Sequence, residues 1–198
     1  MKELVQYAFD FFGYVIPGLF VIFSICIIAI PLDSFEQVIE LTSNFEIGMT
    51  TVLIVVAYVI GFCIYPIGRM LYKTLGFKLF GNRIVNNSKK SGLSVPAKYA
   101  LLRHYSPINF KYVESWNIYC AMSHNLMVAC LVYSLVAIIR AFEGINVVFW
   151  IGTAVFSLLL FLILTHRAVT YFHWAADDIN ATISSLNLEG SPVKDTKM

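Results

Sequence analysis

The chain has 198 residues, of which 59% are hydrophobic and only 13% are charged. Soluble domains carry about 25% charged residues, so this composition excludes an ordinary soluble protein and indicates one that lies in lipid. A bilayer core about 30 Å thick needs roughly 20 apolar residues per helix, so four spans would leave no room for a large soluble catalytic domain.

The first predicted membrane span covers about residues 11–32. Pro17 and Gly18 interrupt it and predict a kink, because proline has no N–H with which to continue the helical hydrogen bonding. No small-residue cleavage site follows this apolar run, so we expect a retained span and not a signal peptide.

The second predicted span covers about residues 47–68, and the two spans together form a predicted first transmembrane hairpin, residues 1–68. Gly61, Pro66 and Gly68 fall in the second span. Proline favours a kink, and small residues allow neighbouring membrane helices to approach closely. We therefore expect tight helix contacts here.

A basic segment, residues 69–117, separates the second span from the third, and its single carboxylate is Glu114. The acidic segment 33–46 contains no Lys or Arg. Because cytoplasmic flanks retain Lys and Arg, this asymmetry predicts a multi-pass protein of the inner (cytoplasmic) membrane with both termini in the cytoplasm. The cations are Arg69, Lys73, Lys78, Arg83, Lys89, Lys90, Lys98, Arg103 and Lys111.

These cations are candidate contacts for anionic lipid headgroups or for a protein partner. Aromatic residues interleave with some of them, which is also a pattern of nucleic-acid binding, but orientation and lipid contact account for most of the charge and we do not expect direct nucleic-acid binding. Within the segment, the second helix should continue to Leu79 and end at Gly81. Ser94 and Pro96 should start a new helix that runs to about Tyr105.

The second predicted transmembrane hairpin covers residues 118–165, with spans at about 118–139 and 147–165. Only a tight turn fits in residues 140–146 between them. Residues 166–198 should form a cytoplasmic C-terminal helix and a polar tail. The predicted fold is therefore all-α, an integral membrane four-helix bundle with cytoplasmic helical extensions.

A heptad-like stripe of apolar residues follows the fourth span, with spacings of three and four. One interpretation is a helix face that packs with other copies of the chain or with a soluble partner. The other is that the stripe covers the cytoplasmic helices of its own subunit. Its residues are Val169, Phe172, Ala176, Ile179, Ile183 and Leu186.

Three consecutive polar residues, Ser123, His124 and Asn125, lie inside the third span, and Asn117 lies seven residues earlier. An ionisable group within a membrane is a candidate functional residue, because exposing it to lipid is costly. We therefore predict an intramembrane polar site. It serves either as a hydrogen bond between helices or as a proton or ligand site.

His166, His173 and Asp177 have spacings of seven and four, which place them near one helical face. One helix supplies too few converging ligands for zinc, so we expect no metal and no other cofactor. The four cysteines fall in apolar spans and are expected to be buried hydrophobes. Sequence signatures of catalysis are missing, and the chain is not predicted to be an enzyme.

The layout resembles that of small four-helix membrane proteins encoded in bacterial defence loci, in particular the membrane subunit of the Kiwa antiphage system. The resemblance lies in residues 13–18 (GYVIPG), residues 57–61 (AYVIG), the basic segment and the helical C-terminal extension. It implies a homo-oligomeric inner-membrane sensor of phage-associated disturbance that works with a cytoplasmic DNA-binding partner.

The leading hypothesis is thus an oligomeric inner-membrane sensor or scaffold, in contact with lipids, that recruits a cytoplasmic protein partner in antiphage defence. A first alternative is an ion channel or pore-forming effector whose path is lined by Ser123, His124 and Asn125. A second alternative is a membrane enzyme that acts at the inner lipid interface through His166, His173 and Asp177.

Overall fold

The computed structural model describes residues 11–29, 37, 46–81, 93–144 and 146–188, and most of these are helical with no strand among them. Among these residues, four helical stretches are long and apolar enough to cross a membrane. The chain is therefore an all-α, multi-pass membrane protein, which confirms the predicted fold class. The four stretches are Phe11–Ala29, Ile47–Phe80, Pro107–Phe142 and Val147–Ser185.

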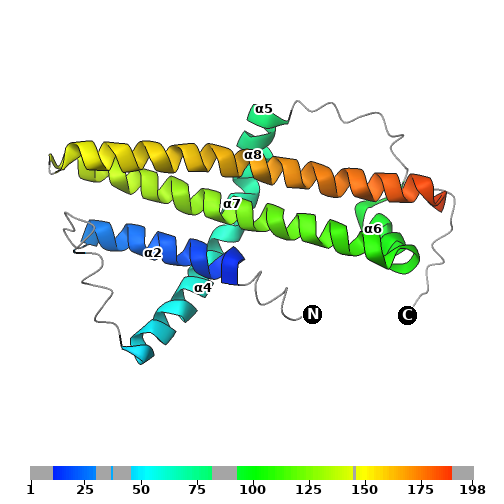
Figure 1. The fold of residues 1–198 in the computed structure, drawn as a ribbon, viewed down its shortest axis with the longest axis horizontal. Coiled ribbons are helices and arrows are strands. Elements are labelled where there is room, and N and C mark those ends of the chain that lie inside the picture. Colours follow the sequence, from blue (N-terminus) through cyan, green and yellow to red (C-terminus); the bar gives the residue numbers. More distant parts are fainter. Residues whose placement is uncertain (1–10, 30–36, 38–45, 82–92, 145, 189–198) are drawn as a thin grey trace.

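Helices α7 (Pro107–Phe142) and α8 (Val147–Ser185) form a long antiparallel hairpin (Figure 1). The turn between them is short, as predicted, and Gly144 and Asn146 adopt positive φ angles of 82° and 50°. With 36 and 39 residues, both helices exceed the roughly 20 residues that cross a bilayer. They therefore extend well past the bilayer at the end opposite the turn.

We call the turn between α7 and α8 the hairpin end and the opposite end the basic end. Near the hairpin end, Ser157 of α8 donates a hydrogen bond of 2.8 Å to the carbonyl oxygen of Cys130 on α7. Small buried residues such as Ala137 and Ala154 let the two helices lie close together. Interhelical hydrogen bonds and small residues are the usual contacts between helices in lipid.

At the basic end, α6 (Val95–Tyr105) packs against both α7 and α8. Ser94 caps α6 by accepting a hydrogen bond of 3.4 Å from the Ala97 amide, and the helix ends at Tyr105, as the sequence predicts. An apolar core lies between the three helices and makes this end a packed layer of its own. Its buried residues are Leu101, Leu102, Phe110, Val113, Ala175, Ile179, Ile183 and Leu188.

Helix α2 (Ile16–Ala29) lies beside α7 and runs nearly parallel to it (Figure 1). A π-helical turn, η1 (Phe11–Val15), precedes it. Pro17 sits in the first turn of α2, so the predicted interruption of the first span takes the form of a change from π- to α-helical geometry.

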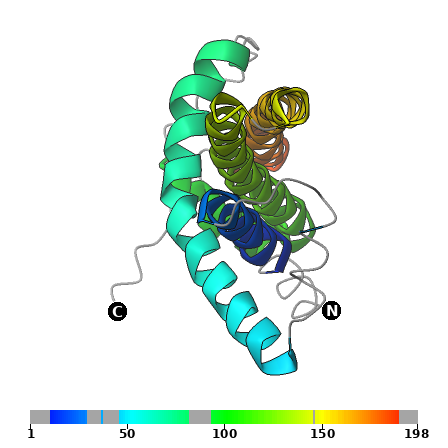
Figure 2. The same cartoon turned by 90° about the vertical axis from the view of Figure 1, so that its left-hand side faces the viewer.

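Helix α4 (Ile47–Leu71) continues through a second π-helical turn, η2 (Tyr72–Gly76), into α5 (Phe77–Phe80), which confirms the predicted extension to Leu79. This long element crosses α2, α7 and α8 at a steep angle (Figures 1 and 2). The first two spans are therefore not packed along their length as an antiparallel hairpin. Apolar helices longer than the bilayer thickness accommodate by tilting, which suits this crossing.

Candidate functional site: the helix crossing at His124

Glycines on α4 mark the points where it crosses its neighbours. The backbone of Gly61 lies against the backbone of Tyr14 in η1, and that of Gly68 lies against His124 in α7. A Cβ atom on Gly68 would come within 2.7 Å of the His124 Nδ1 atom. Gly76, in the following turn η2, packs against the side chains of Val169 and Thr165 on α8. Because no larger residue fits at Gly61 and Gly68, glycine there is what permits α4 to cross η1 and α7, as the small residues of the second span predict.

Pro17 explains a second contact at the crossing. A proline cannot donate to the carbonyl group four residues earlier, which here belongs to Gly13. The Asn125 side chain of α7 is fully buried and donates its Nδ2 hydrogen to that same Gly13 oxygen at 2.7 Å. Asn125 therefore gives the Gly13 carbonyl group a donor in place of the N–H that Pro17 lacks, which is the helix-to-helix hydrogen bond considered for this residue.

His124 lies between two tyrosines, Tyr65 of α4 and Tyr72 of η2. Its imidazole stacks on the Tyr72 ring, with centroids 5.4 Å apart and planes inclined by 9°, and meets the Tyr65 ring edge-on at 4.8 Å. The side chain is only 2% exposed. Its Nδ1 atom, which faces Gly68, has no hydrogen-bond partner among the described residues. The ring therefore acts mainly through shape and stacking.

Consecutive residues of α7 thus contact two different π-helical turns. Asn125 binds η1 through Gly13, and His124 stacks on Tyr72, the first residue of η2. Single π-helical turns inside α-helices are rare and are frequent at functional sites. We call this group of residues the crossing site: Gly13, Tyr65, Gly68, Tyr72, His124 and Asn125.

The crossing site contains only two of the three polar residues predicted in the third span. Ser123 donates to the carbonyl oxygen of Tyr119 in its own helix, and within the described residues it has no hydrogen bond to another element. Asn117 donates to the Tyr99 hydroxyl at 2.7 Å and does not share a hydrogen bond with His124.

Tyr65 and Tyr72 have the residue type and the position near the end of a span that are typical of an aromatic belt at the membrane interface, but both pack on His124 inside the chain. The available signal was their spacing with Gly68. Positions 65, 68 and 72 lie three and four residues apart, which places them on one helical face.

His166, His173 and Asp177 do not converge. His166 contacts the Phe80 ring at 5.3 Å and His173 contacts the Phe77 ring at 5.6 Å, while Asp177 is exposed. The described part of the chain holds no group of three His, Cys, Asp or Glu side chains arranged to bind a metal ion. The two histidines instead help to pack α5 against α8.

Six of the nine candidate cations lie in the described ranges, and Arg83, Lys89 and Lys90 lie outside them. Lys98 donates to the Asn180 side chain at 2.9 Å, and so links α6 to α8. Arg103 lies over the Phe110 ring at 4.9 Å, and Phe110 itself is buried. The aromatic residues that interleave with cations in the sequence are therefore partly core residues. Those with exposed side chains are Arg69, Lys73, Lys78, Arg103 and Lys111.

The apolar stripe of α8 packs largely inside its own chain. Val169 belongs to the central core together with Tyr72, whereas Ile179 and Ile183 belong to the core of the basic end. These contacts agree with the interpretation in which the stripe packs against helices of its own subunit. Phe172 and Ala176 are half-buried, and Leu186 is 44% exposed.

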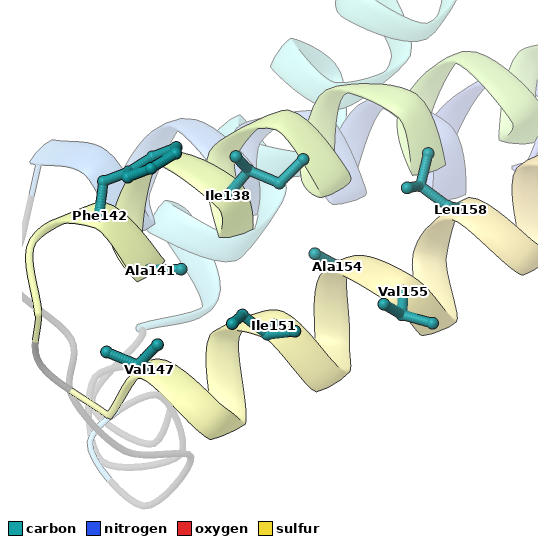
Figure 3. A pocket seen from close by; sticks show the side chains of 8 residues that line it. All are labelled: Ile138, Ala141, Phe142, Val147, Ile151, Ala154, Val155 and Leu158. Carbon is teal, nitrogen blue, oxygen red and sulfur yellow. The ribbon is translucent and has the colours of Figure 1, made fainter.

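An open groove of about 340 Å³ lies between α7 and α8 at the hairpin end (Figure 3). Every side chain that lines it is apolar, so it offers no hydrogen bond or charge to a ligand. It suits an acyl chain or another apolar helix. The lining residues are Ile138, Ala141, Phe142, Val147, Ile151, Ala154, Val155 and Leu158.

No family model matches the chain, and no match was found among curated proteins or solved structures.

Proposed function

We propose that this chain is an inner-membrane sensor or scaffold that passes a change in the bilayer to a cytoplasmic protein partner. Homo-oligomerisation and a role in antiphage defence, which the resemblance to the Kiwa membrane subunit implies, are parts of the same proposal.

The crossing site is the observation that carries it. His124 and Asn125 tie α4 and η1 to one point of α7. From that point α7 runs without interruption to Pro107 at the basic end, where it is held by α6 and α8. Because packed helices move as rigid bodies, a change in the tilt of α4 would be passed to the basic end.

The charge distribution supports a cytoplasmic basic end. Of the exposed cations, Arg103 and Lys111 lie at the basic end, and Arg69, Lys73 and Lys78 lie on α4, η2 and α5. All five belong to the segment that the positive-inside rule places in the cytoplasm. With an even number of spans, both termini lie on that same side.

A surface at the basic end supports recruitment of a protein. Tyr105, Ile108 and Tyr112 are 54%, 70% and 59% exposed, although they precede the predicted third span. Ile108 and Tyr112 lie one turn apart on α7, flanked by Lys111 and Arg103. Exposed apolar residues rimmed by charges are typical of a protein-binding surface.

The test is purification of the full chain from its host in mild detergent. We expect a soluble protein in fixed ratio to it, and loss of that protein with Ile108→Glu but not with Ser184→Glu, an exposed control position on α8. Cross-linking in intact membranes should give multimers. A monomer with no partner in fixed ratio would refute the proposal, and plaque counts on cells with and without the gene test the role in defence.

The alternative functions receive less support from the geometry. His124 and Asn125 are buried inside one chain, so they are badly placed to line a path between several copies. His166 and His173 are separate packing residues. Ion flux through reconstituted protein that disappears with His124→Leu would nevertheless favour the channel over the sensor.

A further inference from the structure

Four aromatic rings from α7 and α8 form one cluster near the basic end. Trp116 stacks on Tyr171 with ring centroids 6.0 Å apart, and meets Trp174 edge-on at 4.9 Å. Tyr119 contacts Tyr171 at 5.5 Å and is exposed. Trp116, Tyr171 and Trp174 are half-buried, so each keeps part of its surface open to the surroundings.

A carboxylate borders this cluster. Asp178 accepts a hydrogen bond of 2.8 Å from the indole nitrogen of Trp116. On α8 it follows Tyr171 by seven residues and Trp174 by four, so the three side chains share one helical face. Asp178 is half-buried, and no salt bridge within the described ranges engages it. We call Trp116, Tyr119, Tyr171, Trp174 and Asp178 the aromatic–carboxylate site.

The position of the site along the hairpin indicates what surrounds it. Tryptophan and tyrosine gather where the membrane meets water, with their rings at the level of the lipid headgroups. Tyr119 and Trp116 lie at the start of the apolar stretch of α7, and Tyr171 and Trp174 follow that of α8. The carboxylate of Asp178 is therefore at or just beyond the headgroup layer.

We infer that the aromatic–carboxylate site binds the ammonium headgroup of an ethanolamine phospholipid in the leaflet at the basic end. A primary ammonium group can lie over the open ring surfaces and donate a charge-assisted hydrogen bond to Asp178. An anionic headgroup without an amine would meet only repulsion from that carboxylate. The inference goes beyond the proposed function, because it needs the chain to span a membrane but needs no protein partner.

Native mass spectrometry of the purified full chain tests the inference. The chain is mixed with equal amounts of dioleoyl phosphatidylethanolamine and dioleoyl phosphatidylglycerol. We expect the wild type to retain the ethanolamine lipid in roughly two- to five-fold excess, the ratio that an exposed cation–π contact supplies. Asp178→Asn should remove the preference while keeping an acceptor for Trp116, and Asp177→Asn, at an exposed position pointing elsewhere, should preserve it.

Equal retention of the two lipids by the wild type, or an unchanged preference in Asp178→Asn, would overturn the inference. Fluorescence gives a second readout that does not depend on lipid release from detergent. The chain has three tryptophans, and Trp150 is buried at the hairpin end. In a Trp150→Phe background, brominated ethanolamine lipid should quench Trp116 and Trp174 more than brominated glycerol lipid does.

Adding Asp178→Asn to that background should equalise the two quenching curves without changing the thermal unfolding midpoint. Equal quenching before this substitution is added contradicts the inference. These assays report lipid selectivity and not partner recruitment. A negative result here would therefore not decide the outcome of the co-purification experiment.

Discussion

The imidazole of His124 lies flat against the phenol ring of Tyr72, with ring centroids 5.4 Å apart. The two residues come from different helices and are 52 positions apart in the chain, which is 124 minus 72. Their contact joins the buried centre of α7 to the π-helical turn η2, where α4 leaves its apolar stretch. Substitutions around this pair test whether the crossing site acts only by packing and stacking or also through the polar atoms of the imidazole.

Replacing His124 separates the two possibilities. His124→Phe keeps a ring between Tyr65 and Tyr72, so we expect the free energy of unfolding to change little. His124→Ala leaves a cavity and should cost about 3 kcal/mol. Thermal unfolding in detergent measures both. If the Phe variant proves as unstable as the Ala variant, the polar atoms of the imidazole matter and the site has chemistry beyond stacking.

Gly68→Ala should weaken the packing of α4 on α7. The added methyl group would meet the His124 backbone and Nδ1, and overpacking of this kind costs about 1–3 kcal/mol. Gly48→Ala is the matched control, since nothing lies within 4 Å of a Cβ there. It should leave the unfolding midpoint unchanged or raise it, because alanine favours helix. Equal midpoints for the two variants would contradict the close approach.

Asn125→Leu should destabilise the chain by about 1 kcal/mol, because the Gly13 carbonyl loses its donor. The loss should be smaller in a Pro17→Ala background, where residue 17 regains an N–H that can bond to Gly13. A double-mutant cycle on unfolding free energies measures this coupling. Strictly additive effects would show that Asn125 does not compensate for the proline. Ser123→Ala, which removes only a bond within α7, serves as the control.

The layer at the basic end depends on α6. Leu102 is fully buried between α6, α7 and α8, so Leu102→Ala should cost about 2–5 kcal/mol and loosen this layer. Limited proteolysis should then cut within α6 earlier than in the wild type. Val95→Ala, at a position 65% exposed, should leave the cleavage rate as it is. Similar rates in both variants would show that this layer is not held by its apolar core.

Local signals predicted local structure well. Ser94 and Pro96 predicted the start of α6, and the short polar connection predicted the turn between Phe142 and Val147. These features depend on residues that are neighbours in the chain, such as the Ser94 side chain that accepts from Ala97. The positions of the four apolar stretches could likewise be predicted from the sequence, because a helix that crosses lipid must be long and largely uncharged.

How those stretches pack against one another could not be predicted from the sequence in the same way. An apolar helix can face lipid or another helix with equally apolar side chains, so periodicity did not reveal that α4 crosses α7 at a steep angle. Tyr72 illustrates the difficulty. Its type and position suit an interface belt, yet it is 4% exposed because His124, far along the chain, covers it.

The glycine contacts of α4 bear on the sequences that relatives of this chain can carry. At Gly61 and Gly68 a single methyl group would meet backbone atoms, so we expect related sequences to keep glycine at both positions. Other positions of the second span, such as Val55 and Phe62, are exposed apolar residues, and exchange for another apolar residue would change stability little there. Distant relatives should therefore share a sparse set of small residues within a second span that otherwise looks unrelated.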